Sequence, residues 1–441
     1  MIDRLSIDSL FRKGLLLIAL FLPFQALPRT IWAEYNPGSD LPLPIKLSGQ
    51  VDEATLFLSI ALLFTFVCLR SGVYRLSFMG LGKWITLFMA VSFVSIALNG
   101  VRPLQGLFGV YDLLKNIMFL FVFQMLRFGE KELQGFISAL KYVGIILAIF
   151  AVIGELLALF FEAGIGILVA DNVRYGLYRV LSLSGEGNHN YIGVFAVFVF
   201  SLIFIKREKR LDDFAALWML AVLIMLTFSR QAWLGFVVML FLLCRLNTKL
   251  AIALLSVPLL LTAINFYEGI SEILTADMSF DPEKYFRLYA FIYSLKILGE
   301  HIFLGLGPGT FGGLASILFE SGVYEEWPAF FKEYAFRING IDQFWPVVWA
   351  ETGVMGMLAY SMIFVALYSR VRRAYAFFRK EGDIYMYSLG RALTGFTLVI
   401  VIMGFAGGLN SAFVIVSFLG TAGMYLSRFH EESRKHAGGP G

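Results

Sequence analysis

Long apolar segments recur along the whole chain, and they constrain its fold more than any other feature. Hydrophobic residues make up 59% of the 441 residues and charged residues only 15%, whereas soluble domains are about 45–50% apolar and about 25% charged. Since a helix needs roughly 20 mostly apolar residues to cross a bilayer, the pattern predicts an all-α, polytopic membrane protein with about 12 transmembrane helices. We expect spans near 14–33, 53–69, 78–98, 106–126, 136–160, 190–205, 214–229, 232–246, 250–266, 344–368, 384–407 and 411–427.

Two of these spans are short and are separated only by Arg230 and Gln231. A single helix across both of them would be too long for a bilayer and would carry an arginine at its middle, where a charge is costly. The sequence therefore predicts a tight hairpin at this point.

The lysines and arginines between the spans predict the orientation of the chain. With the N-terminus placed inside, most of the basic residues in short connections fall on the inner side, as the positive-inside rule requires. We expect residues 1–441 to form a single membrane domain with both termini in the cytoplasm. Its largest connection, residues 267–343, then becomes one long outward-facing loop that is itself helical.

One part of this loop has a helical pattern. Between Glu283 and Gly299, apolar residues such as Phe286, Tyr289 and Ile292 recur near helical spacing, which indicates an amphipathic helix. Such a helix suits a lipid headgroup or a lipid-linked substrate at the outer leaflet. The alternative is a helix that only caps the bundle.

Several charged or polar residues lie where the membrane makes them expensive. Arg230 lies at the outer end of a span, Asp342 and Gln343 precede another, and Glu351 follows about two turns inside it. Charges at such positions usually face a cavity or a partner; the alternative is a structural ion pair, such as Arg230 with Glu351. Within the span 106–126, we expect Asp112 and Lys115, three residues apart, to pair with each other.

A glycine-rich segment, Gly307-Pro-Gly-Thr-Phe-Gly312, matches the dinucleotide pattern G-x-G-x-x-G. No strand precedes it, so a dinucleotide site is rejected. Gly307 and Gly309 could instead offer backbone N–H groups to a phosphate, and the alternative is that they only permit tight turns.

His189 and Asn190 lie at the outer mouth of the span 190–205. His189 could carry a proton, or both residues could form a cap-like turn. Asp281 and Glu283 are a weak metal candidate, and the chain has no HExxH, CxxC or Walker sequence. We therefore expect no metal and no cofactor.

Four motifs, taken in order, resemble those of the O-antigen ligase/polymerase superfamily of bacterial membrane glycan transferases. The segment 184–191 looks like the family's Gly…Asn-x-Asn entry to a span, and Ser229-Arg230 looks like its first essential arginine. The stretch 287–311 is similar to its long-loop signature, and Asp342-Gln343 with 351–356 resembles its His-Asn … Glu-x-Gly-x-x-Gly span. One departure is Asp342, which stands where the family usually has histidine.

The resemblance implies a GT-C-type fold in the bacterial inner membrane, with the active site facing the periplasm. It also implies a polyprenyl-pyrophosphate-linked glycan, such as an undecaprenyl pyrophosphate, as donor. The expected acceptor is a glycan or lipid A-core, the expected surroundings are membrane lipids, and the resemblance implies that no nucleotide sugar is used. A net charge of +4 is too small to argue for nucleic acid.

The chemistry of such a transfer assigns expected roles to the motif residues. The leaving pyrophosphate needs fixed guanidinium groups, for which Arg230 and Arg287 are the candidates, with Arg174, Arg179 and Arg337 in reserve. The acceptor hydroxyl needs a base, for which we expect Asp342, and a single displacement inverts the anomeric carbon. The expected substrate-binding residues are Arg230, Arg287, His189, Asn190, Gln343, Gly307, Gly309, Tyr289 and Trp345.

Other functions remain open at this point. Asp342 favours a polymerase of O-antigen or exopolysaccharide over an O-antigen ligase, and a protein acceptor comes third. A lipid-linked glycan transporter or flippase would carry charges through the middle of several spans, whereas the costly residues here cluster at one end. A purely structural membrane protein is the remaining alternative.

Overall fold

The computed structural model describes residues 4–36, 41–48, 51, 53–60, 81–126, 128–174, 176–185, 189–244, 282–338, 340–341, 343–405, 407 and 412–436. The expected span 250–266, most of the span 53–69, the acidic pair's Asp281 and the expected base Asp342 lie outside the described residues.

The long helices overlap the expected spans, but their bounds differ: the span 14–33 is divided among α1, η1 and α2, and α15 and α17 continue past 368 and 427. The bundle contains α1 (Arg4–Phe21), η1 (Leu22–Phe24), α2 (Leu27–Tyr35), α5 (Leu81–Leu98), α6 (Pro103–Met125), α7 (Glu130–Phe161), α8 (His189–Phe204), α9 (Leu211–Leu226), α10 (Arg230–Cys244), α15 (Phe344–Lys380), α16 (Ile384–Met403) and α17 (Ala412–His436). Shorter elements are α3 (Leu43–Ser48), η2 (Ser182–Ser184), α12 (Pro282–Glu300), α13 (Leu314–Leu318), η3 (Gly322–Glu326) and α14 (Ala329–Arg337).

In the described part of the chain, six helical stretches are long and apolar enough to cross a membrane: Phe11–Tyr35, Leu81–Leu98, Pro103–Met125, Glu130–Phe161, Phe344–Lys380 and Ile384–Met403. The apolar helices Asn190–Phe204 and Arg230–Cys244 are shorter. The chain is therefore an α-helical, multi-pass membrane protein, and the count of about 12 spans stays a prediction.

The hairpin expected at Arg230 is confirmed. Helix α9 ends at Leu226, and α10 begins at Arg230. Between them Phe228 adopts a positive φ of 47°, and the backbone N–H of Ala232 donates to Ser229 Oγ at 3.4 Å. This hydroxyl satisfies one of the N–H groups that the first turn of a helix leaves without a partner.

A small antiparallel ribbon departs from an all-helical chain. Strand β1 (Val169–Arg174) pairs with β2 (Leu177–Val180), and Val169 faces Val180. Both valines are fully buried, and β2 contacts α7 and α9. The ribbon is thus fastened to the bundle by its apolar residues, in a segment that the apolar-span pattern leaves as a connection.

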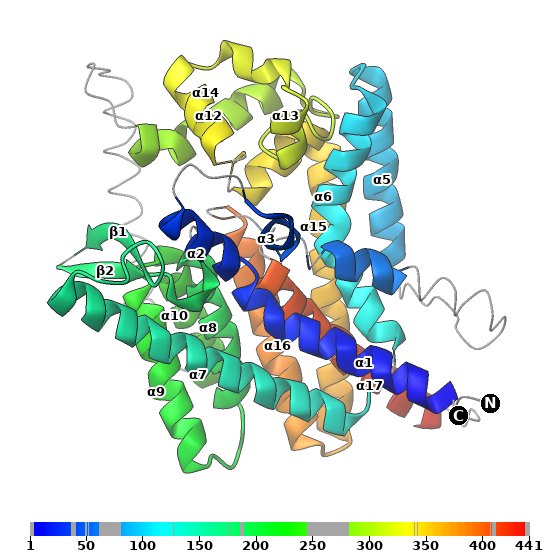
Figure 1. Ribbon diagram of the computed structural model, residues 1–441. Helices are drawn as coiled ribbons and strands as arrows, with labels where there is room; N and C mark the ends of the chain where they lie inside the picture. The colour runs from blue at the N-terminus through cyan, green and yellow to red at the C-terminus, as the bar shows by residue number, and fades with distance from the viewer. Residues whose placement is uncertain are drawn as a thin grey trace.

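Helices α12, α13 and α14 form a layer at one end of the molecule, where α13 contacts α6 and α12 contacts α15 (Figure 1). The helix expected at Glu283–Gly299 is confirmed as α12, which packs on α14 and α15. Its expected apolar face is only partly right, because Ile292 and Leu295 are exposed. Phe286 and Ala290 are buried, and Trp349 Nε1 donates to Ser294 Oγ at 3.0 Å. The buried face of α12 therefore caps the bundle, as the alternative interpretation holds.

The two chain ends lie at the other end of the molecule, opposite this layer (Figure 1). Helix α1 contacts α17, so the first and last described helices pack together.

Helix α15 is broken at Gly353, where φ is 64° and ψ is −167°. The expected span 344–368 is therefore not one continuous helix. The chain that follows α12 fills the break: Leu306 N–H donates to Ala350 O at 2.9 Å, and Val354 N–H donates to Ile302 O at 2.8 Å. Irregular backbone at membrane depth is tolerated when neighbouring protein satisfies its polar groups, and this segment does so.

Candidate functional site

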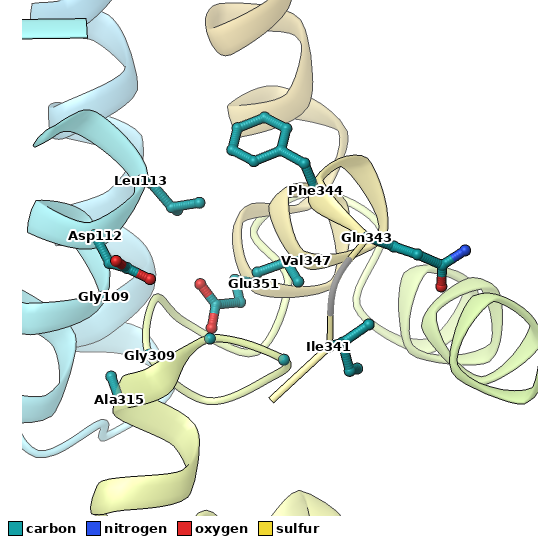
Figure 2. Close-up of a pocket in the computed structure, with 12 residues that line it drawn as sticks. Gly109, Asp112, Leu113, Gly309, Ala315, Ile341, Gln343, Phe344, Val347 and Glu351 are labelled. Carbon is teal, nitrogen blue, oxygen red and sulfur yellow. The ribbon is translucent and has the colours of Figure 1, made fainter. Parts of the chain in front are cut away.

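A pocket lies where α6, α15 and the glycine-rich segment meet (Figure 2). The pocket is small: its volume of about 10 Å³ is enough for about one water molecule. Its lining residues are Gly109, Asp112, Leu113, Gly309, Gly312, Gly313, Ala315, Ile341, Gln343, Phe344, Val347 and Glu351. The motifs around Gln343, Glu351 and the glycine-rich segment therefore meet in one place.

Glu351 holds the glycine-rich segment in position. Its side chain is 1% exposed, and Oε1 accepts a hydrogen bond from Phe311 N–H at 2.9 Å. The N–H groups of Gly309 and Thr310 also point to this carboxylate. Among the described residues Glu351 makes no ion pair, so the structural pair with Arg230 is wrong.

The glycine-rich segment packs against α6 backbone to backbone. A Cβ atom on Gly109 would collide with the backbone of Gly309, and Gln105 Nε2 donates to Gly309 O at 2.8 Å. Gly307 N–H donates to Glu351 O at 2.8 Å. The tight-turn interpretation accounts for these glycines, because their N–H groups are used inside the protein.

Tyr324 supports the segment from the side of the loop layer. The Gly312 N–H donates to the Tyr324 hydroxyl at 2.9 Å, and Ser316 Oγ lies 2.7 Å from the same oxygen. The Tyr324 side chain is fully buried, and burial raises the pKa of its phenol to about 12.

Gln343 reaches the pocket, but Trp345 does not line it. Gln343 Nε2 donates to Phe405 O at 3.3 Å, and Gln343 Oε1 is buried with no hydrogen-bond partner among the described residues. Trp345 Nε1 donates to Val401 O at 2.8 Å, and its indole packs against Gly404 and Phe405. Its neighbour Phe344 supplies the aromatic side chain at the pocket.

The two arginines expected at the pyrophosphate lie on separate elements, and neither lines the pocket. Arg230 is the first residue of α10 and is half-buried. Arg287 is exposed on α12, beside the buried Phe286, which packs on Tyr334 with ring centroids 4.8 Å apart.

Of the alternative candidates for the pyrophosphate, Arg179 and Arg337 do not line the pocket either. Arg179 Nη2 donates to Asn190 Oδ1 at 3.4 Å, and Arg337 lies over the Tyr334 ring at 4.8 Å. The side chains of Arg174 and His189 lie outside the described residues. His189 begins α8, and Asn190 is 9% exposed.

Tyr289 belongs to an aromatic cluster in the loop layer. Its ring stacks on Phe331 with centroids 4.1 Å apart, and it meets Trp327 edge-on at 5.2 Å. Burial and the nearby Glu326 carboxylate raise the pKa of the Tyr289 phenol. Because Phe331 covers one face of the ring, Tyr289 has at most its other face to offer to a sugar.

Asp112 is a charged residue of the pocket that the sequence did not indicate as part of the site. Its expected pair with Lys115 is confirmed, with Nζ and Oδ1 2.8 Å apart. The same carboxylate also faces Glu351 across the pocket (Figure 2). The sequence did contain a signal, an acid within the expected span 106–126, but the expected ion pair with Lys115 was enough to explain it.

The comparison with known proteins coincides with this site. Residues 215–361 match the family model described as O-antigen ligase. The matched segment is about a third of the chain, and it contains Arg230, Arg287, the glycine-rich segment and Glu351. No curated protein matches the chain.

Proposed function

Because residues 215–361 place the chain in the O-antigen ligase/polymerase superfamily, we propose that it is a membrane glycosyltransferase of the bacterial inner membrane. It transfers a polyprenyl-pyrophosphate-linked glycan to an acceptor hydroxyl at the outer face. The observation that carries the proposal is the pocket of Gln343 and Glu351, in which most of the lining residues belong to the matched segment.

In the proposed reaction, Arg230 and Arg287 bind the pyrophosphate of the donor. Arginine suits this role because its fork binds phosphate bidentately and stays charged. The acceptor oxygen forms a bond to the anomeric carbon as the bond from that carbon to the pyrophosphate breaks. The acceptor's proton passes to Asp342, the pyrophosphate leaves with the bonding electrons, and the anomeric configuration inverts without a metal.

The pocket supports the position of Asp342 in this scheme. Its two chain neighbours, Ile341 and Gln343, both line the pocket. We assign Gln343 and Gly309 to the acceptor side, and His189, Asn190 and Tyr289 to the donor glycan. We assign Gly307 and Trp345 to positioning the site. Gly307 donates a hydrogen bond to α15, and Trp345 donates one to α16.

The proposed arrangement in the membrane is a single domain over 1–441, with 267–343 outside and both termini in the cytoplasm. It is supported by the position of α12–α14, at the end of the molecule opposite the described termini (Figure 1).

We favour a polymerase, which passes the glycan to another polyprenyl-linked repeat, over an O-antigen ligase, which passes it to lipid A-core. The support is Asp342 at the position where the family usually has histidine.

The test is turnover by purified protein. Polyprenyl-pyrophosphate glycan is incubated with and without lipid A-core, beside the Asp342→Asn variant. A ladder from the donor alone establishes a polymerase, and product only with lipid A-core establishes a ligase. Wild-type inactivity in both mixtures favours a transporter, and undiminished activity of Asp342→Asn removes Asp342 as the base. A product that retains the donor's anomeric configuration would exclude single displacement.

A further inference from the structure

Two carboxylates, those of Asp112 and Glu53, pair with the single ammonium group of Lys115. Lys115 Nζ lies 2.8 Å from Asp112 Oδ1 and 3.0 Å from Glu53 Oε1. One ammonium group thus serves two carboxylates. Since Glu53 alone would balance the charge of Lys115, the second carboxylate is not needed to neutralise this lysine.

The other oxygen of Asp112 is turned toward the pocket. A Cβ atom on Gly313, which lines the pocket, would lie 3.6 Å from Asp112 Oδ2. Within the described chain Oδ2 accepts no hydrogen bond. The side chain is only 12% exposed, so Oδ2 has limited access to water and is left to meet a hydrogen-bond donor that enters the pocket.

Glu351, on the opposite wall, is engaged already. Its carboxylate accepts the N–H groups of the glycine-rich segment, with Phe311 at 2.9 Å. Of the two acids that face each other in Figure 2, Asp112 is therefore the one with an oxygen to offer to an entering group. The pocket has room for about one water, and a single hydroxyl group is of that size.

We propose that Asp112 Oδ2 binds the acceptor hydroxyl, which fills the space between Asp112 and the glycine-rich segment. The inference rests on the proposed function and adds a residue from α6, outside the matched segment, to the acceptor site. Asp112 accepts the hydrogen bond of the bound hydroxyl and so fixes the position of its oxygen. This hydrogen bond is broken when the same proton passes to Asp342 during transfer. The site then selects a group that donates a hydrogen bond.

The test compares Asp112→Asn with Glu53→Gln. Both variants remove one carboxylate from Lys115, but Glu53 does not line the pocket. The acceptor is supplied as lipid A-core or as a repeat-unit glycan without pyrophosphate, so that its KM is separate from the KM of the donor. We expect Asp112→Asn to raise this acceptor KM about 10-fold or more, since hydrogen bonds to charged groups are the strong ones. Glu53→Gln should leave that KM within about 2-fold, and both variants should keep the wild-type KM for the donor.

Two measurements distinguish failure of this inference from failure of the proposed function. Turnover is measured with polyprenyl-pyrophosphate glycan, with and without lipid A-core, and the Kd of lipid A-core is measured on the same proteins. An active wild type with equal effects of both substitutions, or an unchanged acceptor KM in Asp112→Asn, overturns this inference alone. A wild type that neither turns over nor binds lipid A-core overturns the proposed function and the inference with it. If Asp112→Asn does not fold, Asp112→Glu, which keeps the charge but moves the oxygens, takes its place.

Discussion

Gly353 of α15 lies directly against the carbonyl group of Phe303, so closely that a Cβ atom at position 353 would collide with the Phe303 backbone. The contact occurs at the break in α15, where the chain after α12 satisfies the carbonyl of Ala350. Position 353 therefore decides how closely the loop layer is joined to the bundle.

Gly353→Ala should lower the thermal unfolding midpoint in detergent, because it adds a clash to a backbone with φ of 64°. We expect a loss of more than about 2 kcal/mol. Gly382→Ala is the matched control: its φ is 76°, and nothing lies within 4 Å of its Cβ position. The control should cost about 1–2 kcal/mol from the backbone conformation alone. Equal shifts in the two variants would contradict the close approach.

Glu351→Gln should loosen the glycine-rich segment. The amide of glutamine has the size of the carboxylate, but one of its two acceptor oxygens is replaced by an NH₂ group. This NH₂ cannot accept the hydrogen bonds that backbone N–H groups donate to Glu351. We expect a loss of about 1–3 kcal/mol, measured as the thermal midpoint, together with a fall in turnover. The exposed Glu325 supplies the control, Glu325→Gln, which should change neither value. Wild-type stability of Glu351→Gln would show that this carboxylate does not hold the segment.

Tyr324→Phe should destabilise the same segment from the other side. The substitution leaves the buried N–H of Gly312 without its acceptor, a loss of about 1–3 kcal/mol. Tyr293→Phe is the matched change, because the Tyr293 hydroxyl bonds the exposed Glu326 carboxylate at 2.8 Å. Its effect on the thermal midpoint should be smaller. The reverse order would mean that the Gly312 contact contributes little.

Arg230→Lys and Arg287→Lys should each lower turnover about 10-fold or more, because lysine keeps the charge but loses the bidentate fork. Expression and the thermal midpoint should stay near wild type. Arg372→Lys, an exposed residue near the end of α15, is the control. Full turnover in either lysine variant would remove that arginine from the proposed pyrophosphate site.

The contribution of Glu326 should depend on pH in one direction. The Tyr293 hydroxyl, and then Lys296 at 3.1 Å, lower the pKa of the Glu326 carboxyl in the folded protein. A group with a lowered folded-state pKa stabilises the fold above its unfolded-state pKa of about 4.3. That stabilisation is lost as the pH falls through the folded value.

The difference in thermal midpoint between wild type and Glu326→Gln should accordingly be present at pH 7 and shrink as the pH falls below about 4.3. High salt should reduce it as well, because the carboxylate is exposed. A difference that stays constant as the pH falls and as salt is added would mean that the contribution is not electrostatic.

Local signals predicted much of the helical framework. Runs of apolar residues marked the long helices, the hairpin followed from Arg230 between two short runs, and α12 followed from its helical spacing. These features depend on neighbours in the sequence. They can therefore be read without knowing which helices pack together.

The break at Gly353 and the pocket depend on contacts between distant segments. The apolar pattern continues across Gly353. The break is stable because the backbone groups of Ile302 and Leu306 replace the helical hydrogen bonds lost there. The second role of Asp112 requires the approach of α15 to α6. Trp345 shows the same limit, since an aromatic residue in a span does not reveal which way it points.

The break in α15 has a mechanical consequence. The carbonyls of Ala350 and Glu351 are held by Leu306 and Gly307, and the Glu351 side chain holds Phe311. The first half of α15 and the glycine-rich segment are thereby joined by hydrogen bonds, and Val354 on the other side of the break bonds the same stretch of chain at Ile302 O. A force that lifts α12 is transmitted through these hydrogen bonds to the wall of the pocket, so the loop layer and the bundle interior cannot move independently.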